Sequence, residues 1–373
     1  MSDLLVCTHT PVLRSGQAVR TYGIARALAA HGPLTLLYVR FGDEQPDETF
    51  AAIPGIELRE TLPSRGLRRL LAYAGAQRRG VPSDFARGIS AELGDDAARL
   101  ATELSAGRVV ADGPIAAAAL AKLAGTRPVI YNAHNFESGF RHEFQSGRTT
   151  SVRAMRRFER GLLERASESW MVSDADLRAA RELYPDARLR YVPNVVDVTA
   201  IEPVEPRLDQ QRAVFVASFT YEPNRSGLQF LLEQVLPRVW ETLPQAKLAL
   251  VGAGLEQPPS SDPRVETLGF VDDLREAYAR SSCAVVPLLQ GGGTPLKFVE
   301  ALAYGLPVLA TPRAAAGLDV HDGEDCLIAD GAEAFAAALV RLLGEGDAEL
   351  GARGRALAAE RYSIETLSML LAG

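Results

Sequence analysis

Residues 290–311, QGGGTPLKFVEALAYGLPVLAT, carry the side chains best suited to bind a charged ligand. Near its start, the stretch has three consecutive glycines, Gly291, Gly292 and Gly293. Because glycine has no side chain, a ligand could approach the backbone closely here. Thr294 then stands where a helix N-cap is expected, Pro295 follows at the first helical position, and the helix is expected to end at Gly305. Because a helix N-terminus presents free N–H groups and partial positive charge, this stretch predicts a phosphate site.

Lys297 and Glu300 are three residues apart and therefore share one face of that helix. The lysine could neutralise phosphate, and the carboxylate could accept hydrogen bonds from sugar hydroxyls, so together they suit a nucleotide. The alternative is a flexible surface loop followed by an ordinary ion pair. Two observations favour a ligand site. Lys297 is one of only three lysines in the chain, and the loop follows the apolar run 283–289, as a ligand loop follows a parallel strand.

Length and composition describe a two-domain globular protein. The chain has 373 residues, of which 47% are hydrophobic and 23% charged. No window approaches the roughly 20 apolar residues of a membrane span, and the first residues lack the features of a signal peptide. Three widely separated cysteines, Cys7, Cys283 and Cys326, favour reduced thiols and a cytoplasmic location. No cysteine and histidine cluster has the spacing of metal ligands.

Charge is distributed unevenly along the chain. Residues 1–190 carry a net charge of +4 and residues 191–373 a net charge of −11, which together give the overall −7. This asymmetry fits a first half that meets something anionic, such as a membrane surface or a phosphorylated acceptor. Uneven surface composition between two domains would look the same.

Short apolar runs, such as 34–39, 247–251 and 306–310, alternate with helical patterns, such as 152–165, 174–183 and 226–240, which predicts βαβ units and parallel sheets. The alternation breaks at 193–212, which holds three prolines and no periodicity, and then resumes. We therefore expect an α/β protein with two Rossmann-like, doubly wound domains that face each other across a cleft. The expected boundaries are a first domain at 1–192, a linker at 193–212, a second domain at 213–360, and a final helix at 361–373 that returns to the first domain.

The ordered series of motifs resembles the retaining glycosyltransferases of the GT-B fold, family 4. The resemblance covers nearly the whole chain and is strongest in the second half. The motifs that carry it are Ser15-Gly16 with Arg20-Thr21-Tyr22, Tyr131-Asn132-Ala133-His134-Asn135 with Glu137, Val172 to Asp176, Val192-Pro193-Asn194 with Asp197, Tyr221-Glu222-Pro223-Asn224, Leu250-Val251-Gly252, Leu268 to Val271 with Asp273-Leu274, and Gly291 to Glu300 with Gly305 to Val308.

The resemblance implies that the second domain binds a nucleotide-sugar donor and the first domain binds the acceptor. By it, Glu300 would hold the ribose, while Lys297, Arg225 and the amides around Gly293 and Thr294 would hold the diphosphate. The backbone of Gly269, Phe270 and Val271 would line the base. Gly16 would let the first domain approach the donor phosphate, and His134 would lie near the reacting sugar. The same motifs add to the substrate-binding set Asn135, Asn224, Gly292, Pro295 and Leu296.

Two positions depart from the family pattern. Many relatives carry an acidic residue eight positions before the ribose glutamate, where this chain has Gly292. Relatives often have a basic residue just after the strand that ends at Ala217, where this chain has Ser218 and Phe219. Sugar recognition would then rest on backbone amides or on other residues, and phosphate binding would depend more on Lys297 and Arg225.

No cofactor or metal is expected, since a lysine, an arginine and a helix N-terminus would stabilise the leaving diphosphate. Asp174-Ala175-Asp176 has the form of a metal-binding acidic pair, but Asp174 is better read as an N-cap. His134 is not assigned as a base. Nucleic acid is excluded as a partner because the chain is acidic and lacks a binding motif. The basic runs 65–79 and 153–160 could touch anionic lipid headgroups, although each alone is more typical of a solvated helix face.

The leading hypothesis is a cytoplasmic retaining glycosyltransferase that moves a hexose-type sugar to an acceptor in surface-polysaccharide, glycolipid or natural-product synthesis. One alternative is a nucleotide-sugar epimerase or hydrolase of the same fold. Another is a nucleotide-sugar-binding protein that has lost catalysis, prompted by Gly292 in place of the acid. A dinucleotide-dependent dehydrogenase is disfavoured because no G-x-G-x-x-G follows the first strand.

Overall fold

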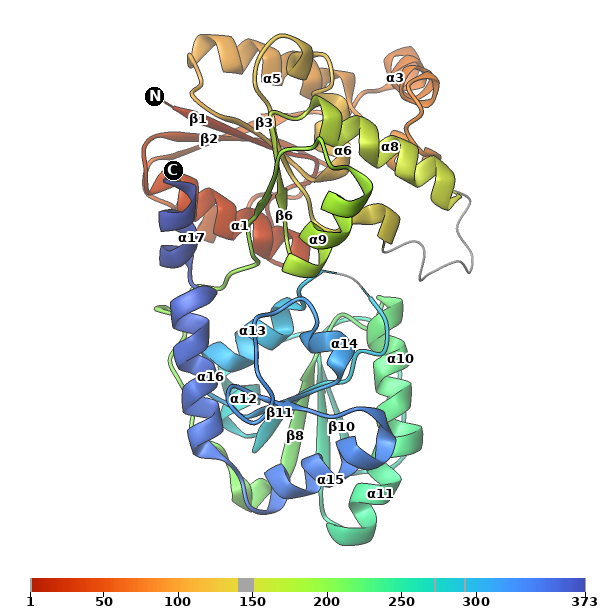
Figure 1. Ribbon diagram of the computed structural model, residues 1–373, viewed down its shortest axis with the longest axis vertical. Coiled ribbons are helices and arrows are strands. Elements are labelled where there is room, and N and C mark those ends of the chain that lie inside the picture. The colour runs from red at the N-terminus through yellow and green to blue at the C-terminus, as the bar shows by residue number, and fades with distance from the viewer. Residues whose placement is uncertain (1, 140–150, 272, 292, 373) are drawn as a thin grey trace. The chain divides into compact units, whose positions relative to one another are not determined.

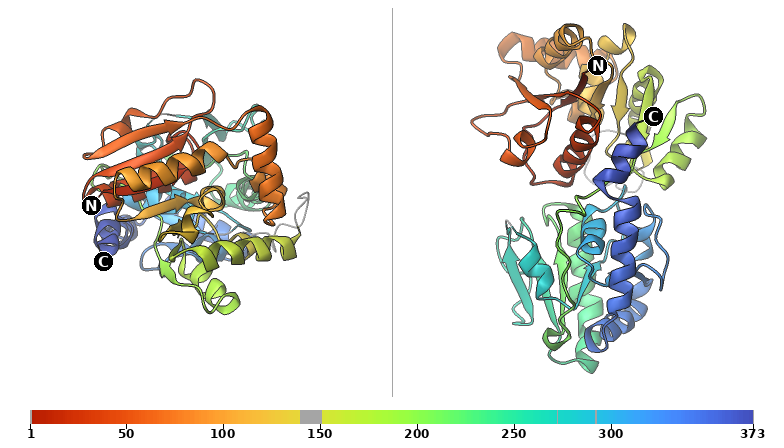
Figure 2. Two further views of the ribbon diagram at one scale, coloured as in Figure 1. Left: turned by 90° about the horizontal axis from the view of Figure 1, so that it is seen from above. Right: turned by 90° about the vertical axis from the view of Figure 1, so that its left-hand side faces the viewer.

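The computed structural model describes residues 2–139, 151–271, 273–291 and 293–372. The chain forms two compact units, the first made of Met1–Asn194 with Leu367–Gly373 and the second of Val195–Thr366. Each unit contains one sheet with helices packed around it (Figures 1 and 2).

The first unit holds a seven-stranded parallel sheet in the order β3-β2-β1-β4-β5-β6-β7. Its strands are β1 Asp3–Cys7, β2 Leu34–Val39, β3 Ile56–Thr61, β4 Val109–Asp112, β5 Ile130–Asn132, β6 Glu168–Met171 and β7 Leu189–Tyr191. The helices between them are α1 Gly16–Ala29, α2 Glu48–Ala51, α3 Gly66–Arg78, α4 Ser83–Ala86, α5 Ala91–Glu103, α6 Gly113–Ala119, α8 Val152–Arg165 and α9 Asp174–Leu183, with a 3₁₀ turn at Leu123–Gly125. The strand order reverses direction between β1 and β4, and such switch points are where doubly wound sheets bind ligands.

The second unit holds a six-stranded parallel sheet in the order β10-β9-β8-β11-β12-β13. Its strands are β8 Arg212–Val216, β9 Lys247–Val251, β10 Val265–Gly269, β11 Cys283–Val286, β12 Val308–Ala310 and β13 Leu327–Ile328. Its helices are α10 Glu222–Phe230, α11 Leu236–Thr242, α12 Arg275–Ala279, α13 Leu296–Ala303, α14 Pro312–Ala315, α15 Gly331–Gly344 and α16 Ala348–Arg361, with a 3₁₀ turn at Leu208–Gln210. The switch point lies between β8 and β11.

The second sheet is covered on both faces because alternate strand residues point to opposite sides. Phe215 and Leu250 pack with α10, α11 and α15, whereas Val214 and Val251 pack with α12, α13 and α16. A sheet buried on both faces needs strands that are apolar throughout, which is why the runs in the sequence predicted these strands.

Prolines cause three differences from the predicted elements. The run 283–289 leaves the sheet after Val286, because Pro287 has no N–H to donate to a neighbouring strand, and β12 begins at Val308 after Pro307 for the same reason. The single helix expected at 226–240 is α10, a π-helical turn at Leu231–Val235, and α11, whose first turn contains a proline. Without that proline N–H the backbone widens for one turn.

The proline-rich stretch 195–212 is packed within the second unit and is not a free linker. The backbone N–H of Val204 donates to the carbonyl of Tyr304 (2.9 Å), and that of Arg207 donates to Ser281 (3.0 Å). At the other end of the chain lies α17, Ile364–Leu371, whose residues from Leu367 onward belong to the first unit. None of the helices in the described ranges has the length and apolar composition needed to cross a bilayer.

Candidate functional site

The glycine loop follows β11, one of the two strands at the switch point of the second sheet. Gly291 has φ +121° and Gly293 has φ +71°, backbone conformations that other residues rarely adopt, so glycine is required at both positions. Gly292, also predicted to bind substrate, lies outside the described residues. The carbonyl of Gly291 accepts a hydrogen bond from the guanidinium of Arg313, which fixes the loop from the α14 side.

The helix after the loop begins one residue later than predicted. Pro295 is the N-cap, in an extended conformation, and α13 starts at Leu296. The N-cap role predicted for Thr294 is therefore wrong: its hydroxyl donates to the carbonyl of Gly317 instead, at 3.4 Å. The first backbone N–H groups of α13 belong to Leu296 and Lys297, so these amides, close behind Gly293, form the positive end of the helix. Gly305, with φ +79°, ends the helix as predicted.

Lys297 is partly buried in the first turn of α13. Its ammonium donates a hydrogen bond to Oδ1 of Asn224 on α10 and lies 5.2 Å from the ring centre of Phe215. Asn224 is held in place because its Nδ2 donates to the carbonyl of Ser218 (2.7 Å). Burial lowers the pKa of Lys297 to about 7. An anion that reached this amine would favour its charged form.

Glu300 lies one turn further along α13, with the hydroxyl of Tyr278 3.5 Å from its Oε2. Tyr278 stacks on Tyr304 with ring centres 4.4 Å apart, which fixes one wall beside the carboxylate. Burial raises the pKa of Glu300 to about 7, against a smaller opposing effect of the Tyr278 hydrogen bond. The alternative of an ordinary ion pair is wrong within the described side chains, because Lys297 contacts Asn224 and Glu300 contacts Tyr278.

The start of α10 lies against the glycine loop. A side chain at Gly291 would come within 4 Å of Pro223 and Tyr221, and Nε2 of Gln290 donates to the hydroxyl of Ser226 (3.2 Å). Arg225, the predicted phosphate contact, is on the same helix. It is exposed and donates from Nε to Glu222 (3.0 Å), so this guanidinium is already paired with a carboxylate.

The predicted base-binding stretch follows β10. The carbonyl of Gly269 accepts from the N–H of Gly252 (2.7 Å), Val271 packs against the core, and Phe270 leaves 57% of its side chain exposed. Leu289 is also exposed, after β11, so apolar side chains are available near the carboxyl ends of two strands of this sheet.

In the first unit, His134 forms a hydrogen bond from Nε2 to Oδ1 of Asp112 (2.8 Å), the last residue of β4. Asp112 is fully buried and also accepts from Nδ2 of Asn132 (2.7 Å) and the hydroxyl of Thr21 (2.5 Å). Burial alone would raise the pKa of Asp112, but the charge and hydrogen bond of His134 outweigh it and lower this pKa to about 2. Because the carboxylate can only accept, Nε2 of His134 must carry a proton in this hydrogen bond.

A buried arginine ties this cluster to the end of the first unit. Arg20 on α1 donates to Oδ1 of Asn132 (2.6 Å), to the carbonyl of Val192 (3.0 Å) and to Oδ1 of Asn194 (3.1 Å). Burial lowers its pKa to about 10, which still leaves it charged at neutral pH. Asp112 and His134 are therefore held in place by a hydrogen-bond network that includes Arg20, Thr21, Asn132 and Asn194.

The loop after β1 lies next to the same cluster. Nδ1 of His9 lies 3.2 Å from Nε2 of Gln17, within hydrogen-bonding distance. Burial lowers the pKa of His9, and the charge of Asp112 opposes this effect. Gly16 is the first residue of α1 and is exposed, with Ser15 as the N-cap. Asn135 is half-buried beside His134.

Asp112 and Gly113 were missed by the sequence reasoning. Gly113 has φ +86°, and a Cβ atom there would lie 2.8 Å from Cε1 of His134, so glycine makes room for the imidazole. The available signal was the Asp-Gly pair directly after the buried strand at Val109, the same kind of position that made His134 a candidate.

The acidic pair at Asp174 and Asp176 is part of a helix start. Ser173 is the N-cap, its hydroxyl accepting from the N–H of Asp176 (3.0 Å), and Asp174 pairs with Arg178. The N-cap role predicted for Asp174 is thus one residue off, since Ser173 is the residue in an extended conformation. Across the described ranges, no group of three or more His, Cys, Asp or Glu side chains is placed to hold a metal ion.

Two family models match the chain. The glycosyl transferase 4-like domain matches residues 15–195, and the glycosyl transferases group 1 model matches residues 210–345. No curated protein sequence matches it. Together the two family matches span most of the chain and coincide closely with the two structural units.

Solved structures with the same fold are glycosyltransferases of low sequence identity. Sucrose-phosphate synthase from Thermosynechococcus elongatus is 16% identical with a TM-score of 0.75, covering 100% of this chain and 98% of that one. Anabaena HepE, solved with UDP and glucose, is also 16% identical, with a TM-score of 0.72 and the same coverage. WaaG, a glycosyltransferase of lipopolysaccharide biosynthesis, is 16% identical with a TM-score of 0.67, covering 99% of this chain and 100% of that one.

The two Rossmann-like units and these likenesses define a protein of the GT-B fold. With both family models matched in order, the chain belongs to the group 1 glycosyltransferases and is an enzyme of that class.

Proposed function

We propose that the chain transfers a sugar from a nucleotide diphosphate-sugar to an acceptor, with the donor bound at the carboxyl edge of the second sheet. The observation that carries this proposal is the pair Lys297 and Glu300. Both lie on α13 directly behind the glycine loop, and burial shifts the pKa of each toward neutrality. Ionisable groups shifted in this way, at the switch point of a sheet, are typical of a ligand site.

In this scheme the diphosphate accepts from the backbone N–H groups of Gly293, Thr294, Leu296 and Lys297, with the Lys297 ammonium beside it. The ribose hydroxyls donate to Glu300. Phe270 and Leu289 offer apolar surface to the base. Arg225 would reach the phosphate only by leaving Glu222, which costs little for an exposed ion pair. The solved complexes of HepE with UDP support a uridine donor as the first candidate to test.

Transfer breaks the bond between the anomeric carbon and the diphosphate oxygen, whose electron pair leaves with the diphosphate. The acceptor hydroxyl oxygen bonds to the same carbon, on the same face in a retaining reaction, and its proton passes to the leaving phosphate. Lys297 and the α13 amides stabilise the charge that develops on the leaving group, so transfer proceeds without a metal ion. His134, fixed by Asp112 in the acceptor-binding first unit, orients the reacting sugar.

The acceptor would be a sugar, lipid-linked or small-molecule hydroxyl used in surface-polysaccharide, glycolipid or natural-product synthesis. WaaG, in lipopolysaccharide biosynthesis, supports that range. Three free cysteines that are all buried suit a reducing compartment, so we place the enzyme in the cytoplasm.

The test begins with thermal-shift screening against UDP-, GDP-, TDP- and ADP-sugars, followed by calorimetry with the best nucleotide and its 2′-deoxy analogue. Glu300→Gln should weaken nucleotide binding and remove the preference for the ribose form. Lys297→Met should weaken binding of both forms by about 10- to 100-fold, the value of a lost charged hydrogen bond. The control is Lys247→Met. Lys247 is the first residue of β9, at the end of the strand away from the carboxyl edge of the sheet, and it pairs with Glu266. Unchanged binding in both site variants would refute the site, and donor consumption without acceptor would indicate a hydrolase.

A further inference from the structure

The helix α3, Gly66–Arg78, carries three large apolar side chains with high solvent exposure. Among the large apolar side chains of the described residues of the first unit, only Met369 is as exposed. Leu67, Leu70 and Leu71 are 70%, 66% and 62% exposed, and the only buried residue of the whole helix is Ala76. Their spacing of three and four residues places them on one side of the helix, here called the leucine face. An exposed stripe of three leucines is typical of a surface that meets another apolar phase.

The surroundings of the leucine face are strongly basic. The helix contains no acidic residue, and arginines occur within it and at both of its ends. Arg68 pairs with Glu92 and Asp95. For four others, Arg65, Arg69, Arg78 and Arg79, no described carboxylate lies within ion-pair distance.

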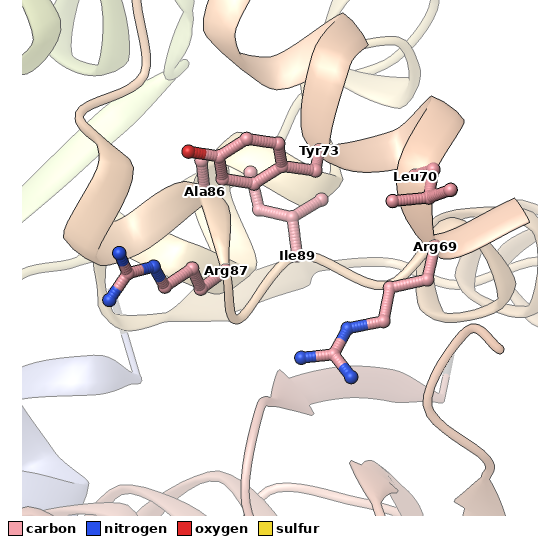
Figure 3. A pocket seen from close by; sticks show the side chains of 6 residues that line it. All are labelled: Arg69, Leu70, Tyr73, Ala86, Arg87 and Ile89. Atoms are coloured by element: carbon pink, nitrogen blue, oxygen red, sulfur yellow. The ribbon is translucent and has the colours of Figure 1, made fainter. Parts of the chain in front are cut away.

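A pocket of about 290 Å³ adjoins the leucine face and shares Leu70 with it. Its apolar lining comes from Ala86, Ile89 and the ring of Tyr73, and its two charged residues are Arg69 and Arg87. Figure 3 shows Arg87 and Arg69 on either side of Ile89, with the ring of Tyr73 above Ile89 in this view. Like Arg69, Arg87 has no ion-pair partner among the described carboxylates.

Arg69 and Arg87 lie beside the apolar lining of the pocket. This arrangement suits a phosphate ester whose carbon chain runs along that apolar lining. Guanidinium binds phosphate oxygens through paired N–H donors, and Ile89 and Tyr73 can contact the methylene groups that follow. Next to them, the leucine face offers a side that can enter the acyl region of a bilayer.

We propose that α3 docks the enzyme on an anionic phospholipid surface, with the leucine face in the interface and a lipid phosphate held between Arg69 and Arg87. Charge complementarity favours this occupant. A second copy of the chain, related by two-fold symmetry, would bring arginines against arginines. A nucleic acid would find leucines where stacking aromatic rings are needed. The inference does not depend on the proposed sugar transfer.

The experiment measures binding of the intact protein to vesicles of phosphatidylcholine alone and of phosphatidylcholine with phosphatidylglycerol. The wild type should bind only the anionic vesicles, and less as salt rises. The triple variant Leu67→Gln, Leu70→Gln, Leu71→Gln should bind the anionic vesicles at least about tenfold more weakly than the wild type. Met369→Gln, which alters a methionine that is also 70% exposed on α17, is the matched control and should bind as the wild type does.

The pocket is tested separately from overall charge. Each arginine near a membrane surface contributes about fivefold in binding, so Arg78→Gln with Arg79→Gln should weaken binding by about 25-fold. Arg69→Gln with Arg87→Gln should weaken it clearly more, because a phosphate site is lost as well. Equal losses in the two double variants would overturn the phosphate site. The docking proposal would be overturned if the wild-type protein did not bind anionic vesicles. It would also be overturned if the only change in the triple leucine variant were the loss of a dimer in sedimentation.

Discussion

The protonation state of Lys297 depends strongly on its surroundings. Its pKa of about 7 means that the ligand-free amine loses its charge as the pH rises through neutrality, whereas the pKa of Glu300, also about 7, means that this carboxylate gains charge over the same range. A diphosphate needs the ammonium, and ribose hydroxyls are held best by the carboxylate. Donor binding should therefore be strongest near neutral pH.

The first prediction is a bell-shaped dependence of donor affinity on pH. Between about pH 6 and about pH 9, calorimetry with UDP-glucose, or with the donor found by screening, should show affinity falling on both sides of about 7, by at most tenfold per pH unit. Lys297→Arg keeps its charge throughout, so it should lose the alkaline decline and keep the acid one. An alkaline decline that persists in this variant would mean that another group titrates.

Asp112 and His134 give a second prediction at this scale. Asp112→Asn can donate as well as accept, so it no longer fixes the proton on Nε2 of His134. We expect turnover to fall about tenfold or more while donor affinity changes little, since the donor is assigned to the second unit. Steady-state kinetics and calorimetry on one preparation separate the two. Equal losses of affinity and turnover would place Asp112 in donor binding.

Single elements show what the sequence could and could not predict. Apolar runs predicted β2, β9 and most other strands, and the helical pattern predicted α8 and α9 to the residue. The two-residue strand β13 is too short to give such a pattern. The contact between Asp112 and His134 joins residues far apart in the sequence and exists only because β4 and β5 pair in parallel. Exposure of the α3 leucines was equally hidden, since their spacing fits a buried helix face just as well.

The turn after β9 supplies the prediction at the scale of elements. Gly252 has φ +129°, and a Cβ atom there would lie 1.9 Å from the carbonyl oxygen of Ala217, at the end of the neighbouring strand β8. Gly252→Ala should therefore destabilise the second unit by about 3 kcal/mol or more. Gly331→Ala, with φ +76° and no atom within 4 Å, carries only the backbone strain and should cost about 1 kcal/mol. Thermal and denaturant unfolding measure both, and similar losses would show that the strands separate to accept the methyl group.

At the scale of the whole molecule, the second unit is one continuous segment, Val195–Thr366, with its own sheet and core. We predict that this segment expressed alone folds and binds the donor nucleotide with an affinity within about tenfold of the intact chain, but transfers no sugar. Circular dichroism establishes folding first, and calorimetry then compares affinities. A folded segment without nucleotide affinity would contradict the assignment of the donor to this unit.

The first unit, by contrast, is discontinuous, since it needs Leu367 and Leu371, both buried, to complete it. Arg108 donates to the carbonyl of Leu371 (2.6 Å), and the ring of His31 lies 2.8 Å from the carbonyl of Ser368. The chain thus leaves the first unit near Asn194 and re-enters it near Leu367, and the two passages run side by side, with the N–H of Val196 donating to the carbonyl of Tyr362 (2.9 Å). In topology one unit is a guest inserted into its host through adjacent entry and exit points. With the donor assigned to the second unit, as we propose, exchanging this inserted segment between relatives should change the choice of activated sugar while the first unit keeps its acceptor.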